Sequence, residues 1–178
     1  MAGEVLVFDL ETQKLADEVG GWGHIDRMGL AAAVTLNTGS GEFKHYLETD
    51  APALLADLRA ASLVVGFNLV RFDYEVLRPY GGADLPTRPT VDMLRHLSDA
   101  LGFRVSLDSV AEATLGIRKA ADGLQSVRWY KRGELEKVLD YCQQDVSLTH
   151  QVYQYGREHR HVKFRDRFGK ARRVAVGW

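Results

Sequence analysis

The stretch VFDLET, residues 7–12, combines the composition of a buried strand with two acidic side chains. Residues 5–10 are mostly large or β-branched apolar residues, which is typical of a central strand in a sheet. Side chains two positions apart in a strand point to the same face, so Asp9 and Glu11 are expected to project together. Two carboxylates held that close repel each other, and burying an unpaired charge is costly. We therefore expect a positive charge between them.

The composition around this stretch is that of one folded domain. The chain has 178 residues, of which 46% are apolar and 26% charged, enough for a sizeable core. Cys142 is the only cysteine, which excludes an intramolecular disulfide and a cysteine-based zinc site. No apolar run approaches the roughly 20 residues that span a bilayer, and the first strand begins too early for a signal peptide. These features predict a cytoplasmic protein.

The charge is distributed unevenly along the chain, although the net charge is only −1. Residues 157–173 contain eight Lys or Arg and two acidic residues, whereas residues 1–156 contain 15 basic and 22 acidic residues. An acidic body with a basic end suits a metal site beside a contact with a polyanion. A solvated charged hairpin explains the basic end equally well.

The first part of the chain predicts a three-stranded meander and then alternating helices and strands. The expected strands are residues 5–10, 30–37, 42–48, 62–68 and 88–94. The expected helices are residues 52–61, a segment from 68–71 to 80, and a segment ending at 101. Residues 18–29 read as a Gly-rich loop, and Asp50 is a candidate N-cap for the first helix.

The second part of the chain is predicted to be mainly helical, with a basic hairpin at its end. A short helix covers residues 106–116, with a Ser cap and a closing Gly. A polar stretch, residues 117–133, precedes the longest helix, residues 134–158. We expect residues 1–160 to form one domain, with residues 161–178 packed on it as the hairpin.

The longest helix carries an acid where an apolar residue is expected. Its apolar stripe includes Val138, Cys142 and Val152, and Tyr141 and Asp145 fall on the same stripe, four residues apart. Asp145 is therefore predicted to point into the protein. An arginine or backbone N–H groups can satisfy a buried aspartate without any functional role.

The segment GFNLVRFD, residues 66–73, supplies another polar pair. Asp73 is predicted in the first turn of a helix, where the helix dipole favours a carboxylate, and Asn68 reads as a cap or turn residue. With Asp9, Glu11 and Asp145, it makes four acids at predicted core edges. Carboxylates are the ligands that hard divalent cations such as Mg²⁺ prefer, and two such ions can promote phosphoryl transfer.

These residues resemble the motifs of the DEDD 3′–5′ exonucleases, which have a ribonuclease H-like fold. FDLET matches the first motif, Asp-x-Glu on a strand, and GFNLVRFD is similar to the second motif of the proofreading exonuclease of family B DNA polymerases. YCQQD supplies Tyr141 and Asp145 of a Tyr-x-x-x-Asp motif, and Asp140 stands where the other branch has His. The chain therefore looks like the DEDDy branch from about Val5 to Val152, and it is also similar to stand-alone bacterial exonuclease domains of this fold.

The resemblance implies a mixed sheet of five to six strands, an antiparallel meander followed by parallel strands, flanked by helices. It implies that Asp9, Glu11, Asp73 and Asp145 hold two Mg²⁺ or Mn²⁺ ions at the scissile phosphate, with Tyr141 orienting the attacking water. The predicted substrate contacts are Asn68, Phe72, Leu10 and Thr12, although core packing is an alternative role for Phe72. The implied activity is 3′–5′ hydrolysis of single-stranded nucleic acid to nucleoside 5′-monophosphates, with DNA favoured and RNA possible.

Two other functions remain open from the sequence. One is a catalytically inert module that binds nucleic acid or a protein, although such a relative is expected to lose ligand carboxylates. The other is an endonuclease that cleaves RNA–DNA hybrids, which the Tyr-x-x-x-Asp motif disfavours. Three further features each allow two interpretations. Asp92 is either a cap or an acid that supports the site, and Trp22 and His24 belong either to a lid or to an ordinary loop. Residues 128–130 either contact a single strand of nucleic acid or form ordinary protein surface.

Overall fold

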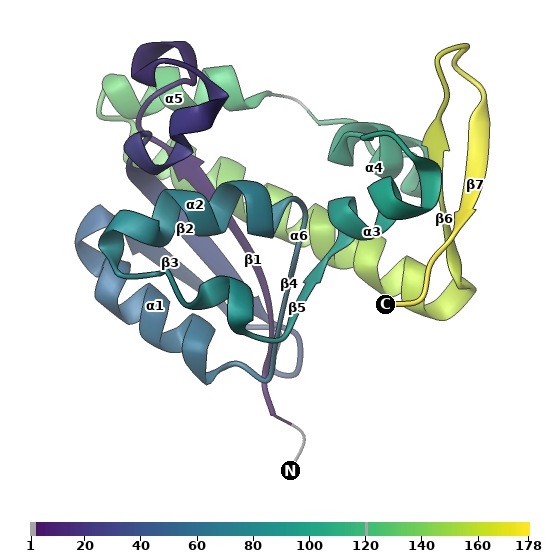
Figure 1. Cartoon of the computed structure of the whole chain (residues 1–178), viewed down its shortest axis with the longest axis horizontal. Coiled ribbons are helices and arrows are strands. Elements are labelled where there is room, and N and C mark those ends of the chain that lie inside the picture. Colours follow the sequence, from purple (N-terminus) through teal and green to yellow (C-terminus); the bar gives the residue numbers. More distant parts are fainter. Residues whose placement is uncertain (1–2, 120) are drawn as a thin grey trace.

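A central five-stranded sheet organises the chain, which a computed structural model describes over residues 3–119 and 121–178 (Figure 1). Its strand order is β3-β2-β1-β4-β5. The bounds are β1 (Val5–Thr12), β2 (Leu30–Asn37), β3 (Phe43–Leu47), β4 (Leu63–Gly66) and β5 (Thr90–Asp92). The pairs β1–β2 and β2–β3 are antiparallel, and β1–β4 and β4–β5 are parallel. The predicted meander followed by parallel strands is confirmed.

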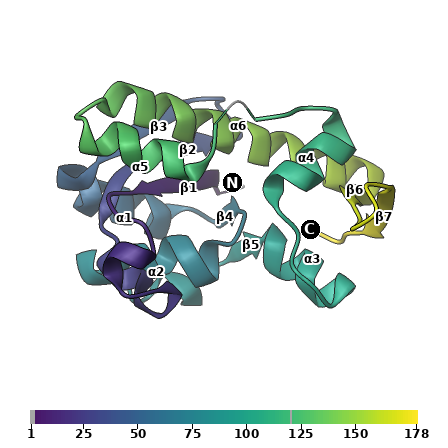
Figure 2. The same ribbon diagram turned by 90° about the horizontal axis from the view of Figure 1, so that it is seen from above.

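Helices cover both faces of this sheet and make three layers (Figure 2). One face packs against α1 (Ala51–Ala60) and α2 (Tyr74–Leu77), and the other against α6 (Leu135–His159). The remaining helices are α3 (Met93–Leu101), α4 (Leu107–Leu115) and α5 (Gly123–Lys131). No helix among the described residues is both long and apolar enough to cross a membrane.

The side chains of β1 alternate between the two faces of the sheet and so pack into two separate cores. Leu6, Phe8 and Leu10 pack in the cluster that contains the buried residues of α1 and α2. Val7 faces the other way and packs with Cys142 and Val146 of α6. Because side chains alternate along a strand, the positions that follow Val7 on the α6 side are 9 and 11. The row that faces α6 therefore begins apolar and ends acidic.

A separate two-stranded sheet ends the chain. It consists of β6 (His161–Arg165) and β7 (Ala171–Ala175), paired antiparallel, and it follows α6 directly. It does not join the central sheet. Oγ1 of Thr114 and Oγ of Ser109, both in α4, accept hydrogen bonds from backbone N–H groups of β6. The predicted hairpin is thus present, and α4 holds one of its edges.

The structure corrects three of the sequence-based expectations. The polar stretch 117–133 contains α5, whose N-cap Asp122 accepts a hydrogen bond from the backbone N–H of Gln125. Only a short buried patch around Val127 anchors α5, so its apolar pattern is weak. The expected loop at 18–29 contains the 3₁₀ turns η1 (Asp17–Val19) and η2 (Trp22–Arg27). Asp50 does not cap α1, because its carboxylate accepts a hydrogen bond from the N–H of Leu47.

Candidate active site

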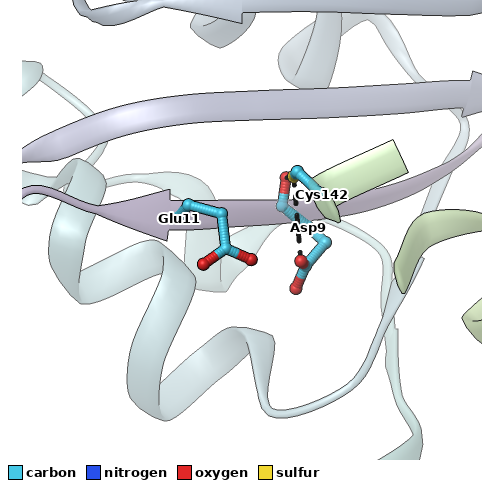
Figure 3. A group of neighbouring side chains, drawn as sticks. All are labelled: Asp9, Glu11 and Cys142. Carbon is cyan, nitrogen blue, oxygen red and sulfur yellow. Dashed lines mark hydrogen bonds between the residues drawn. The ribbon is translucent and has the colours of Figure 1, made fainter. Parts of the chain in front are cut away.

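Two carboxylates from β1 meet the middle of α6. One oxygen each of Asp9 and Glu11 and the Sγ of Cys142 lie within 4.8 Å of one another (Figure 3). The Cys142 thiol donates a hydrogen bond to the main-chain oxygen of Asp9 at 3.3 Å. This contact joins α6 to β1 at the point where the acidic part of the strand begins. The predicted pairing of the two carboxylates on one face is what the structure shows.

Tyr141 and Asp145 flank Cys142 on α6, and both side chains are buried as predicted. The ring of Trp129 in α5 packs edge-on against the ring of Tyr141, with 6.1 Å between the centroids. Trp129 and Tyr130 are partly buried and also pack near Ala31, Ala32 and Val138. Helix α5, which the sequence did not reveal, thus forms one wall beside Tyr141.

Asp73 reaches the site from the opposite side of β1. It ends the π-helical turn η4 (Leu69–Asp73), its side chain is 1% exposed, and its Oδ1 accepts a hydrogen bond from the Leu10 N–H at 3.2 Å. The register of β4 against β1 runs only from Val5 to Val7. Beyond Val7 the edge of β1 needs another partner, and the Asp73 carboxylate provides one for Leu10.

Asp92 fixes the connection that carries Asn68, Phe72 and Asp73. Its Oδ1 accepts from the N–H of Asn68 at 2.8 Å, and its Oδ2 accepts from the N–H of Val70 at 3.0 Å. Its Oδ1 also accepts from the N–H of Arg95, so Asp92 caps α3. Asn68 has φ 70°, a left-handed conformation that this bonding supports. Asp92 is therefore a cap that also shapes the candidate site.

A cavity of about 600 Å³ opens onto the carboxylates. The predicted site residues among its lining are Asp9, Leu10, Glu11, Thr12, Phe72, Tyr141 and Asp145. Trp22, which is 71% exposed, lines it as well, with its ring centroid 6.4 Å from that of Phe72. Asn68 instead lines a neighbouring cavity with Phe72 and Trp22, and its Oδ1 accepts from Nη2 of Arg104 at 3.2 Å. Asp73 lies at the edge of β1, beside Leu10, and lines neither cavity.

Among the described residues, no cation lies within ion-pair distance of Asp9 or Glu11, so the positive charge expected between them is not found there. The nearby cation is Lys119, which pairs with Asp145. Its Nζ lies 2.9 Å from Oδ2 of Asp145, 3.5 Å from Oδ1 of Asp108 and 5.1 Å from the centroid of the Tyr141 ring. Burial lowers the pKa of this ammonium, but the charges and hydrogen bonds of Asp145 and Tyr141 together outweigh burial and hold that pKa above its ordinary value. The sequence places Lys119 in a polar stretch with four other basic residues, so nothing in the spacing singled it out.

Burial and mutual repulsion keep protons on the acidic cluster. Burial, with the charge of Asp145 second, raises the pKa of Asp9 to about 8, against the opposing influence of Lys119. Burial and the Asp9 charge raise the pKa values of Glu11 and of Asp73 well above their usual range. Burial also raises the pKa of Tyr141, so its phenol stays protonated and can donate a hydrogen bond at neutral pH.

This donor set fits a divalent cation. Its oxygen atoms come from carboxylates, which are the ligands of Mg²⁺ and Mn²⁺, and one oxygen of Asp9 lies within 4.8 Å of one oxygen of Glu11. A bound cation favours the ionised form of every carboxylate in the cluster, which offsets the repulsion that otherwise retains protons.

Comparison with known proteins agrees with this geometry. A sequence model of the RNase H superfamily matches residues 6–156. A family B DNA polymerase from the archaeon Pyrobaculum calidifontis is similar in structure, with a TM-score of 0.65 and 16% identity over 86% of this chain and 24% of the polymerase chain. This chain thus spans about a quarter of that polymerase, and the likeness shows a shared fold. No curated protein matches the sequence significantly. Since the superfamily match covers most of its length, the chain belongs to the RNase H superfamily.

Proposed function

We propose that this protein is a metal-dependent 3′–5′ exonuclease that acts on single-stranded nucleic acid, with DNA favoured over RNA. The observation that carries the proposal is the convergence of Asp9, Glu11 and Asp145 on one cavity, with Asp73 at the adjoining edge of β1. Membership of the RNase H superfamily supports a nuclease. The Tyr-x-x-x-Asp spacing of Tyr141 and Asp145 favours the exonuclease branch.

In this proposal the four carboxylates hold two Mg²⁺ or Mn²⁺ ions. Such ions lower the pKa of a bound water and stabilise the leaving oxygen in phosphodiester hydrolysis. Tyr141 donates a hydrogen bond that orients the water, because its raised pKa makes it a poor base. Leu10, Thr12 and Phe72 line the space for the terminal nucleotide, and Asn68 contacts the strand from the adjoining cavity. Hydrolysis with loss of the 3′-terminal residue releases a nucleoside 5′-monophosphate.

The test is a time course on matched 5′-labelled DNA and RNA 20-mers, with Mg²⁺, Mn²⁺ or EDTA. Wild type is expected to give a descending ladder that requires metal, whereas Asp9→Asn and Asp145→Asn should reduce the rate by at least 100-fold. Glu136→Gln removes an exposed acid from the same helix and should leave the rate unchanged.

Two outcomes would contradict the proposal. Metal-dependent cleavage that survives Asp145→Asn would place the chemistry elsewhere. Tight binding of the 20-mers with no cleavage in any lane would instead favour a catalytically inert binding module. A closed circular single strand distinguishes cleavage from an end from internal cleavage. An exonuclease has no end on the circle at which to begin, whereas an endonuclease linearises it.

A further inference from the structure

We propose that the hairpin formed by β6 and β7 is a second nucleic-acid contact, which holds the phosphate backbone of the substrate strand several nucleotides upstream of the cleaved end. This inference rests on the proposed exonuclease function, since it describes the path of the same substrate. The hairpin lies outside the segment that matches the superfamily, residues 6–156. None of its residues lines the cavity at the carboxylates.

The hairpin places two like charges directly opposite each other. Lys163 of β6 pairs in register with Arg173 of β7. The adjacent pair, Val162 and Val174, is buried in the core that includes α6, so Lys163 and Arg173 point to the outer face. Lys163 is partly exposed and Arg173 is exposed, so two like charges share this solvent-facing position. We attribute this arrangement to an anionic partner.

The backbone geometry brings these two side chains especially close. The N–H of Lys163 donates to Oγ1 of Thr114, and the Thr114 hydroxyl donates to the carbonyl of Lys163. Both backbone groups of Lys163 therefore point away from β7, which makes Lys163–Arg173 a non-hydrogen-bonded pair with Cα atoms about 4.5 Å apart. Like charges in this position are destabilising. A phosphate bound between the two side chains would remove that repulsion.

Other cations of the hairpin are also available to a polyanion. Arg165 is paired with Glu112, and Arg172 with Asp166. Over the described part of the chain, no carboxylate lies within ion-pair distance of the other four hairpin cations, which are Lys163, Arg167, Lys170 and Arg173. At the turn, Phe168 is 72% exposed, and the guanidinium of Arg167 lies 4.8 Å from the centroid of its ring. Unpaired cations beside an exposed ring are suited to phosphate contacts and base stacking.

Helix α6 connects this hairpin to the carboxylates and sets their separation. Asp145 lies in the middle of α6 and His159 ends it, so at 1.5 Å per residue the two positions are about 21 Å apart along the helix axis. At about 3.4 Å per stacked nucleotide, that distance corresponds to roughly six nucleotides. In Figure 1 the turn of the hairpin and the carboxyl end of β1 both point to the top of the view, and α4 lies between them. A strand that leaves the cavity would therefore pass α4 on its way to the hairpin.

The test measures binding separately from cleavage. The double variant Lys163→Gln/Arg173→Gln is titrated against a 5′-fluorescein DNA 20-mer in EDTA by anisotropy, over a range of KCl concentrations. We expect an affinity about tenfold weaker than wild type at low salt, and a slope of log affinity against log salt that is smaller by about 1.4, the value for two phosphate contacts to a single strand. Hydrolysis of a DNA trimer with Mn²⁺ should be unchanged, because a trimer cannot span from cavity to hairpin.

A matched control removes two basic residues far from the hairpin. Lys44→Gln/Arg88→Gln changes the net charge equally, but these side chains are paired with Asp57 and Asp84 on other elements. This control should keep the wild-type affinity and salt slope. A second variant at the exposed turn, Arg167→Gln/Lys170→Gln, repeats the test at a position where the fold depends little on the side chains.

The inference is overturned if both hairpin variants bind the 20-mer with wild-type affinity and salt slope, in which case the basic face serves another partner. It is also overturned if trimer hydrolysis falls as much as binding does, because the change would then have reached the carboxylates. Failure of the proposed exonuclease function has a different result. In that case wild type would not cleave the 20-mer, but the hairpin variants would still bind it more weakly. The proposed contact between the hairpin and nucleic acid would then remain supported.

Discussion

At Asp145, burial and a nearby cation act on one carboxylate in opposite directions. Burial raises the pKa of Asp145, and the ammonium of Lys119 lowers it through a 2.9 Å contact. Lys119 therefore reduces the repulsion within the cluster as long as no divalent cation does so. Both side chains are largely shielded from solvent, so removing one partner of this pair costs more stability than breaking an exposed ion pair.

Replacing Lys119 with Gln should destabilise the metal-free protein by about 1–3 kcal/mol, because it leaves Asp145 without its charged hydrogen-bond donor. Saturating Mn²⁺ should recover most of that loss, since a bound ion neutralises the same carboxylate. Urea unfolding with EDTA and with Mn²⁺ measures both effects, and Lys119→Arg is the control that keeps the charge. An equal loss of stability with and without Mn²⁺ would show that Lys119 acts through packing alone.

At the scale of elements, the connection from β4 to α2 depends on a carboxylate that follows a different strand. Asp92, at the end of β5, accepts hydrogen bonds from Asn68 and Val70 and so determines the path of the segment that leads to Phe72 and Asp73. The parallel neighbours β4 and β5 end side by side, which brings Asp92 to the start of that connection.

Asp92→Asn keeps the shape of the side chain but leaves only one acceptor oxygen. The free energy of unfolding should fall by about 1–3 kcal/mol, because one buried backbone N–H loses its acceptor. Hydrogen exchange should accelerate at the amides of Asn68 and Val70 specifically, and the cleavage rate should fall with it. Asp99→Asn, an exposed change on α3, should alter neither quantity. Unchanged exchange at both amides would contradict this role.

The strand and helix periodicities account for the parts of the site that the sequence predicted. Asp9 and Glu11 lie two apart on a strand, and Tyr141 and Asp145 lie four apart on a helix, so local geometry alone places each pair on one face. Lys119 and α5 could not be predicted in this way. Lys119 reaches Asp145 from a segment without regular structure, and its path depends on tertiary packing. The position of Asp73 at the edge of β1 likewise depends on where the pairing with β4 stops.

At the scale of the whole molecule, the protonated acidic cluster links stability to pH and to metal. The pKa of Asp9 is raised to about 8 by burial, whereas an unfolded aspartate has an ordinary pKa of 3.8. Between these values the folded state binds a proton that the unfolded state has released. The free energy of unfolding of the metal-free protein should therefore fall as pH rises from about 4 to about 8.

Thermal or urea unfolding at pH 5, 6.5 and 8 in EDTA tests this dependence. Stability should be lowest at pH 8, and Mn²⁺ should stabilise the protein most at that pH, because metal binding displaces the retained protons. Calorimetric titration with Mn²⁺ in two buffers of different ionisation enthalpy should show proton release at pH 7. Asp9→Asn should flatten the pH dependence. If the stability of Asp9→Asn and of wild type depended on pH with the same slope, Asp9 would not be the group that retains the proton.

The basic hairpin and the carboxylates lie at different positions along one continuous helix, and the hairpin follows the segment shared with the superfamily. The proposed cleavage site and the proposed strand contact therefore belong to separate stretches of the sequence. In the proposed exonuclease, substitutions in the hairpin would change how firmly a strand is held, or which strands are held, while Asp9, Glu11, Asp73 and Asp145 stay in place. This separation gives the proposed exonuclease a route to new substrate preferences that leaves its cleavage site unchanged.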